Sequence, residues 1–203
     1  MASQTTIRVD AARARPAGEP RFSALSQPLS FERIYDAYFR HVVGWMRALN
    51  VPPTDMEDAA QEVFLVVQRK WRGFRGDNLA GWLYRIADLT ARNYRRLAWF
   101  KHLFAREPSR EAAESLVVGG TPAVTLEEKE DRRALTHMLA RMSAKRRETL
   151  ILFEVEGYSG HEIAALQGIP IKTVWTRLHH ARKDLLAMVA ATRKRQQWET
   201  GNA

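Results

Sequence analysis

One segment of the chain constrains the fold more than any other. Residues 158 to 185, YSGHEIAALQGIPIKTVWTRLHHARKDL, hold the start and stop signals of two helices around a tight turn. Ser159 and Glu162 have the spacing of a capping box, which begins a helix. Gly168 can adopt the left-handed conformation that ends this helix, and Pro170 suits the first position of the next. The segment therefore predicts a helix-turn-helix.

The second of these helices is expected to have two unlike faces. Apolar residues recur at spacings of three and four, which predicts a buried stripe of Ile171, Val174, Leu178, Ala181, Leu185 and Met188. The opposite face carries hydrogen-bond donors suited to the major groove of DNA, namely Lys172, Thr173, Thr176 and His180. An ordinary amphipathic hairpin with a solvated basic face is the alternative interpretation of these residues taken alone.

The composition favours a partner with many negative charges. The formal net charge is +9 and the pI is near 10.2, and each Lys or Arg placed on a phosphate releases a counterion. The absence of Cys argues against a disulfide scaffold and removes the commonest zinc ligand. No apolar run approaches the roughly 18 residues of a membrane span, and the N-terminus lacks a secretory core. We therefore expect a soluble, cytoplasmic protein without membrane insertion, metal or cofactor.

Charge also divides the chain into segments. Acids outnumber bases six to three between residues 31 and 68, bases outnumber acids ten to two between 69 and 106, and acids outnumber bases seven to two between 107 and 131. The last segment also contains Pro108, Gly119, Gly120 and Pro122. These patterns predict an all-α chain with two small helical domains joined by a flexible acidic linker. The expected parts are a disordered arm at 1–28, a first domain at 29–105, the linker at 106–125, a second domain at 126–192 and a basic tail at 193–203.

The first domain is expected to contain three helices. Ser30 can cap a helix that ends at Pro52 and Pro53 and has an apolar stripe of Phe31, Ile34, Tyr35, Tyr38, Val42, Trp45 and Leu49. Thr54 and Glu57 have the spacing of a second capping box, before a helix that turns inward Val63, Phe64 and Val67. A third helix follows the loop GFRGDN, and its expected buried edge is Leu79, Leu83, Ile86 and either Leu89 or Thr90.

Aromatic and basic residues are concentrated between 69 and 106. This window holds ten Arg or Lys and eight of the nineteen aromatic residues. Such a mixture suits single-stranded nucleic acid, because cations hold the backbone and each unpaired base can stack on a ring for roughly 1 to 3 kcal/mol. We expect Trp71, Leu83 and Tyr84 to belong to the core. We expect the opposite, a role in binding, for Trp82, Arg85, Tyr94, Arg95 and Arg96.

Three segments in order resemble the extracytoplasmic-function (ECF, group 4) sigma factors, the small two-domain members of the sigma-70 class of bacterial transcription initiation factors. They are DMEDAAQEVFL at 55–65, FRGDNLAGWLYRIA at 74–87 and RRETLILFEVEGYSGHEIAALQGIPIKTVWTRLHHAR at 146–182. The resemblance covers about residues 31 to 190. It implies a sigma2-like domain at 29–105, which binds polymerase and opens the −10 element, and a sigma4-like domain at 126–192, which reads the −35 element.

The resemblance also implies roles for individual residues. The β′ clamp helices of core RNA polymerase would be bound by Asp55, Glu57, Asp58, Gln61 and Glu62. The −10 element would be melted and read by Phe74, Arg75, Asn78, Trp82, Arg85, Asn93, Arg95 and Arg96. The −35 element would be read by Lys172, Thr173, Trp175, Thr176, Arg177 and His180. The polymerase β flap, promoter DNA and an anti-sigma protein complete the implied partners, and the acidic linker would pass through the RNA path of the enzyme.

Four positions depart from the family pattern. Lys172 stands where a glycine is usual and Trp175 where a basic residue is usual, so the −35 sequence read should differ from the common one. Gln167 stands where a leucine usually precedes the turn glycine. Leu89 takes a position often held by Asn, which bears on readout of the −10 element.

Two other functions compete with promoter recognition as explanations of this sequence. A stand-alone helix-turn-helix regulator could carry the same C-terminal pattern, but residues 31 to 100 show no strands alternating with helices, as a receiver or ligand domain would. An enzyme is the other class. His161 and Glu162 begin a zinc-protease pattern, yet position 165 is Ala where the second metal ligand would stand. The sequence therefore predicts a protein that is not an enzyme.

Overall fold

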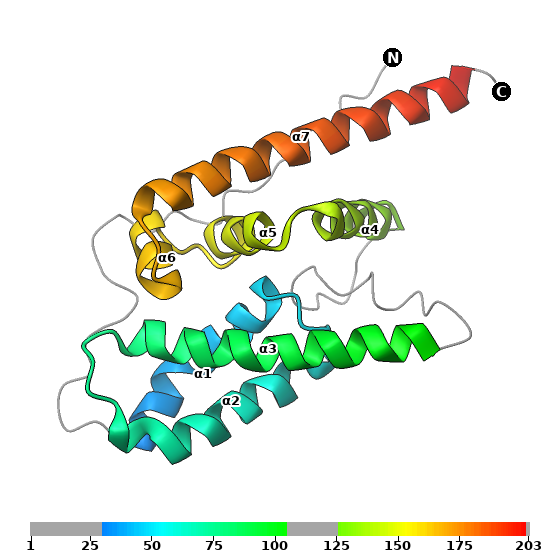
Figure 1. Ribbon diagram of the computed structural model, residues 1–203. Helices are drawn as coiled ribbons and strands as arrows, with labels where there is room; N and C mark the ends of the chain where they lie inside the picture. Colours follow the sequence, from blue (N-terminus) through cyan, green and yellow to red (C-terminus); the bar gives the residue numbers. More distant parts are fainter. Residues whose placement is uncertain (1–29, 105–125, 202–203) are drawn as a thin grey trace.

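The computed structural model describes residues 30–104 and 126–201, and its regular elements there are all helical (Figure 1). In chain order they are α1 (Phe31–Ala48), η1 (Pro53–Asp55), α2 (Met56–Lys70), η2 (Trp71–Gly73), α3 (Leu79–Phe104), α4 (Leu126–Arg141), α5 (Ala144–Leu150), the π-helical turn η4 (Ile151–Val155), α6 (Gly160–Gln167) and α7 (Ile171–Gly201). The predicted all-α class is confirmed. The predicted arm at 1–28 and linker at 106–125 lie outside the described residues.

The three N-terminal helices pack through the faces predicted from their apolar spacing. The Ser30 hydroxyl accepts the Arg33 N–H at 3.3 Å and so caps α1, which buries Ile34, Tyr38, Val42 and Trp45. α2 contributes Val63, Phe64 and Val67 to the core, and α3 contributes Leu83, Tyr84, Ile86 and Thr90. Thr90 rather than Leu89 completes the buried edge of α3, because Leu89 is 58% exposed.

Two predicted helix ends in this domain are wrong. α1 ends at Ala48 rather than at the prolines, because Asn50 adopts a left-handed φ of 62° and the Asn50 and Val51 N–H groups return to carbonyls of the last turn. The capping box of Thr54 and Glu57 does not form. The Thr54 hydroxyl instead donates to the Asp55 carboxylate at 3.1 Å, since Pro53 starts the 3-10 turn η1 immediately before α2.

The predicted helix-turn-helix is confirmed as α6 and α7. The Ser159 hydroxyl accepts the Glu162 N–H at 3.3 Å and the Glu162 carboxylate accepts the Ser159 N–H at 2.7 Å, which completes the capping box. Gly168 ends α6 with a φ of 63°. α7 then buries Val174, Leu178 and Ala181 and continues to Gly201, beyond the predicted domain end at 192. No described helix, α7 included, has the length and apolarity needed to cross a membrane.

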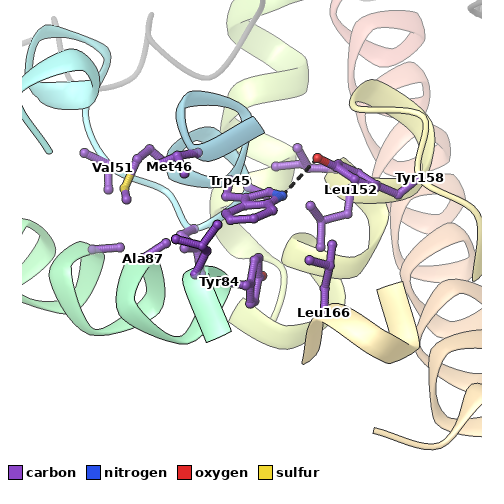
Figure 2. Packing of buried hydrophobic residues seen from close by; sticks show 14 of the residues in the cluster. Trp45, Met46, Val51, Tyr84, Ala87, Leu152, Tyr158 and Leu166 are labelled. Atoms are coloured by element: carbon purple, nitrogen blue, oxygen red, sulfur yellow. Dashed lines mark hydrogen bonds between the residues drawn. The ribbon is translucent and has the colours of Figure 1, made fainter. Parts of the chain in front are cut away.

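The two groups of helices share one hydrophobic core. α4, α5 and α6 lie between α7 and α3 in Figure 1, where α1 contacts η4 and α3 contacts α6. Figure 2 shows Trp45 and Tyr84 of the first group meeting Leu152, Tyr158 and Leu166 of the second. The Trp45 and Tyr84 rings meet edge to face, with centroids 5.2 Å apart. No sequence pattern predicted that the two domains pack together.

Candidate protein and nucleic-acid interfaces

The outer face of α2 is acidic and open to solvent. Four of the residues expected to bind polymerase are exposed there, namely Glu57, Asp58, Gln61 and Glu62, while Asp55 is half-buried at the helix start. Leu65, 53% exposed, lies about one turn beyond Gln61 on the same face. Acidic side chains near a helix N-terminus also interact favourably with its dipole. The face therefore suits a protein partner and repels the DNA backbone.

The loop before α3 brings two predicted aromatic residues together. The Phe74 and Trp82 rings are both half-buried, with centroids 5.3 Å apart. Arg75 is exposed beside them, and its guanidinium donates to the carbonyls of Arg72 at 2.6 Å and Phe74 at 3.1 Å. The result is a pair of rings flanked by a positioned cation, an arrangement that can accept an unstacked base.

Asn78 has both ends of its side-chain amide occupied. The oxygen accepts the Gly81 N–H at 2.8 Å and so caps the start of α3. The nitrogen donates to the Ala165 carbonyl of α6 at 2.9 Å. The structure thus joins this predicted −10 residue to the helix-turn-helix, a contact that the sequence did not predict.

The rest of the predicted −10 residues divide into an outward and an inward set. Arg85, Asn93 and Arg96 are exposed, and Leu89 lies among them at helical spacing. Arg95 is half-buried and its guanidinium donates to the Leu49 carbonyl at the end of α1. Tyr94, also expected at the surface, is half-buried as well, and its pKa is raised by burial and by the nearby Glu62 carboxylate. Among the residues expected to be core, Leu83 and Tyr84 are buried, whereas Trp71 is half-buried with the Arg72 guanidinium 5.6 Å from its ring.

The recognition helix α7 presents most of its predicted donors. Lys172, Thr176 and His180 are exposed and Thr173 is half-buried, while the Thr176 hydroxyl donates to the Lys172 carbonyl at 2.9 Å. Arg177 is half-buried, and its guanidinium donates to the Gln167 side-chain oxygen at 2.9 Å. A hydrogen bond therefore ties Arg177 to α6, whereas Lys172, Thr176 and His180 are open to solvent.

Trp175 has a packing role as well as an exposed edge. It is 47% exposed, yet its ring meets Phe153 edge to face with centroids 5.9 Å apart. A Cβ at Gly160 would come within 2.6 Å of the Trp175 indole, so only glycine allows the ring to lie over the start of α6. Trp175 thus holds α7 against η4 and α6 while leaving part of its ring on the recognition face.

The two residues that begin the zinc-protease pattern, His161 and Glu162, lie at the start of α6. Glu162 belongs to the capping box of α6, where its carboxylate accepts the Ser159 N–H. His161 beside it is exposed. Within residues 30–104 and 126–201, no three His, Cys, Asp or Glu side chains lie close enough to hold a metal ion.

Comparison with known proteins matches both groups of helices. Residues 34–100 match sigma-70 region 2 and residues 132–185 match sigma-70 region 4. The ECF RNA polymerase sigma-E factor of Escherichia coli K12 is 30% identical over 154 residues, which cover 72% of this chain and 80% of that protein. RNA polymerase sigma factor NccH of Alcaligenes xylosoxydans xylosoxydans is 27% identical over 174 residues, which cover 85% of this chain and 93% of that one.

Two solved structures have a similar fold. CnrH in complex with the cytosolic domain of CnrY superposes with a TM-score of 0.55 and 21% identity, over 79% of this chain and 88% of that chain. The sigma factor RpoE in complex with the anti-sigma factor NepR, from Bartonella quintana, superposes with a TM-score of 0.57 and 22% identity, over 79% of this chain and 96% of that chain. At these identities the likeness concerns the fold alone.

Proposed function

Because this chain belongs to the ECF sigma factors of RNA polymerase, we propose that it uses separate surfaces for the polymerase and for each of two promoter elements. As a sigma factor it is a transcription initiation factor, which directs the polymerase rather than catalysing a reaction itself. Its partners are RNA polymerase and promoter DNA. The assignment of each partner to particular residues rests on the charge and exposure of the helices.

The acidic face of α2 is the proposed contact with the β′ clamp helices of core polymerase. Glu57, Asp58, Gln61 and Glu62 are exposed along one side of a helix whose other side is fully buried. A negative surface steers association with a basic protein surface and at the same time keeps DNA away from this helix. Exposed Leu65 adds an apolar contact to the same interface.

The start of α3 is the proposed site for the opened −10 element. Phe74 and Trp82 offer ring faces on which unpaired bases can stack, and Arg75 and Arg85 supply charge for the backbone. A base that leaves the duplex during melting can enter such a loop, where Gly76 lets the backbone approach closely.

The recognition helix α7 is the proposed reader of the −35 element. One observation carries this assignment: α7 buries Val174, Leu178 and Ala181 completely and leaves donor side chains exposed on the other side, Lys172, Thr176 and His180. A helix so anchored can enter the major groove with its N-terminal residues toward base edges. The β flap of the polymerase is the proposed protein contact of this domain.

An anti-sigma protein is the proposed regulatory partner. Both solved structures of similar fold contain a second protein, the cytosolic domain of CnrY in one and the anti-sigma factor NepR in the other. Occlusion of the polymerase-binding and DNA-binding faces would keep the factor inactive until the partner is removed.

Paired charge variants test this division of surfaces. Glu62→Lys reverses the sign of the α2 face and should weaken binding to purified core polymerase at least tenfold, with DNA binding by α7 unchanged. Lys172→Ala should leave polymerase binding unchanged and weaken binding of the holoenzyme to the −35 duplex, with a salt slope reduced by about 1. Lys183→Ala, an exposed lysine farther along α7, is the control. If both charge variants lose polymerase binding equally, or if neither changes either partner, the proposed division is wrong.

A further inference from the structure

The helix-turn-helix is joined to the first three helices by buried hydrogen bonds that meet at one carboxylate. Glu148 of α5 is 4% exposed, and its Oε1 atom accepts the Tyr84 hydroxyl of α3 at 2.6 Å and the Gln167 amide of α6 at 2.7 Å. The other end of the Gln167 amide accepts the Arg177 guanidinium at 2.9 Å. A continuous relay therefore runs from Tyr84 to Arg177.

The Glu148 carboxylate is satisfied partly across the interface: Tyr84 and Gln167 bind Oε1, and Lys145 of α5 itself binds Oε2 at 3.1 Å. Tyr84 is itself 4% exposed, and its pKa is raised by burial and by the adjacent Glu148 carboxylate, so the phenol stays protonated and donates. A buried carboxylate is stable only when its oxygens are hydrogen-bonded. Gln167, which stands in place of the family's usual leucine, supplies one of these donors and orients Arg177 at the same time.

A second set of contacts fastens the same interface at α1. The Tyr158 hydroxyl accepts the Trp45 indole N–H at 3.0 Å and lies 2.7 Å from His41 Nδ1 (Figure 2 shows the first bond). The guanidinium of Arg47 pairs with the carboxylate of Glu156. Together with the Asn78 bond to the Ala165 carbonyl, these contacts make the interface a docking surface for η4 and α6 of the same chain.

One feature of the interface opposes docking. Arg147 of α5 is half-buried and its Nε atom has no hydrogen-bond partner. Burial lowers the Arg147 pKa, and the charge of Arg95 on α3 lowers it further, so two cations face each other across the boundary. Like charges and an unsatisfied donor weaken the packed state, which can then be exchanged for a separated one.

The packed state cannot span a promoter. The −35 and −10 elements lie about 25 base pairs apart, roughly 85 Å of duplex at 3.4 Å per base pair. In the structure, however, the proposed −10 residue Asn78 is bonded directly to α6 of the −35 reader. The 21 residues that join α3 to α4 can reach roughly 70 Å when extended, so the chain itself permits the two domains to separate.

We propose that the relay of Tyr84, Glu148, Gln167 and Arg177 is an intramolecular latch: docking of the helix-turn-helix on α1 and α3 withholds Asn78 and Arg177 from promoter DNA together, and opening releases both. This inference rests on the proposed assignment of the −10 and −35 residues. Gln167 acts in it as a positioning residue, which holds Arg177 against α6 in the docked state.

The test measures opening and DNA binding in the full chain. The absence of Cys allows one cysteine at exposed Arg40 of α1 and one at exposed Lys183 of α7 to be labelled for fluorescence energy transfer. The double variant Tyr84→Phe, Gln167→Leu should lower the transfer efficiency relative to the unsubstituted latch and bind a −35 duplex at least threefold more tightly without polymerase. Core polymerase with promoter DNA should lower the efficiency in both proteins.

Matched controls separate the latch from general damage. Tyr94→Phe removes a hydroxyl from the same helix but on the side of Glu62, and Gln68→Leu changes an exposed amide on α2, so neither should alter energy transfer. Far-UV circular dichroism verifies that the double variant stays helical; Tyr158→Phe, which weakens the same interface through the Trp45 bond, is the replacement if it does not.

The results distinguish failure of the latch from failure of the proposed function. Unchanged energy transfer in the folded latch variants, or opening without tighter −35 binding, overturns the latch while transcription by the unsubstituted protein still supports the proposed function. If the unsubstituted protein fails to direct core polymerase to any promoter, the proposed assignment of surfaces fails and the latch fails with it.

Discussion

At the scale of single residues, the start of the helix-turn-helix depends on Ser159. Its hydroxyl and the Glu162 carboxylate satisfy two N–H groups that a helix start otherwise leaves unpaired. Ser159→Ala should therefore lower the free energy of unfolding by about 1 kcal/mol. Urea denaturation followed by circular dichroism measures this loss.

Ser143 provides the matched comparison for this effect. It occupies the same cap position before α5, but its hydroxyl accepts no capping hydrogen bond. Ser143→Ala should change the free energy of unfolding by only a few tenths of a kcal/mol. Equal losses for the two serines would show that the capping box contributes nothing specific.

The residue scale also shows what sequence patterns miss. Ser30 and Ser159 were predicted as caps because each precedes an apolar period at the right spacing. Asn50, which ends α1 with its positive φ, gives a weaker stop signal in the sequence than the prolines at 52 and 53, although Asn is among the residues that tolerate this conformation. The Thr54 and Glu57 pattern failed because Thr54 lies inside the 3-10 turn η1, so that Asp55 rather than Thr54 is the cap residue of α2, and Asp55 has a helical ψ.

At the scale of elements, the recognition helix is positioned by the contact between Trp175 and Gly160. A Cβ at Gly160 would lie 2.6 Å from the indole, which is too close without movement of α6 or of the ring. Gly160→Ala should therefore cost about 1 to 3 kcal/mol of stability, as overpacking does, and should weaken −35 binding. The free energy of unfolding measures the first effect, and titration with a −35 duplex measures the second.

A double-mutant cycle isolates this contact from other effects of the substitution. In a Trp175→Ala background the indole is gone, and Gly160→Ala should cost much less than in the unsubstituted protein. If the cost is the same in both backgrounds, the clash is with Ile171 or the backbone, and Trp175 does not position α7.

At the scale of the whole molecule, local signals predicted the helices but not their assembly. The apolar stripes of α1 and α7 and the acidic face of α2 follow from residue spacing, and each agrees with the observed burial. The positions of Glu148 and Gln167 could not be predicted in this way, because a polar residue is expected to be exposed to solvent unless its hydrogen-bond partner is known. Tyr84, the partner of Glu148 on α3, lies 64 residues from it in the chain, and Asn78 lies 87 residues from Ala165. Contacts of that separation depend on the packing of the two domains.

The two proposed DNA-binding surfaces are close together in the structure, but their targets are far apart in a promoter. The residues proposed for the two promoter elements lie on or beside α3 and on α7, and α6 contacts both of these helices, whereas the elements themselves lie roughly 85 Å apart. Promoter recognition by this chain therefore combines two surfaces that have to act at a distance from each other. Loss of either surface should abolish promoter selection, even where the other remains folded.

Transcription in vitro tests this central claim most directly. Purified core polymerase and the full-length protein are supplied with a promoter selected from a random library. Three altered versions are tested beside it: one with a changed −35 element, one with a changed −10 element, and one in which the spacing between the elements differs by half a helical turn. We expect a transcript that depends on the protein and is lost with each of the three alterations, because both elements must face their readers at once. A protein that adds no promoter activity to core polymerase, or whose transcript survives loss of the −35 element, would contradict the account.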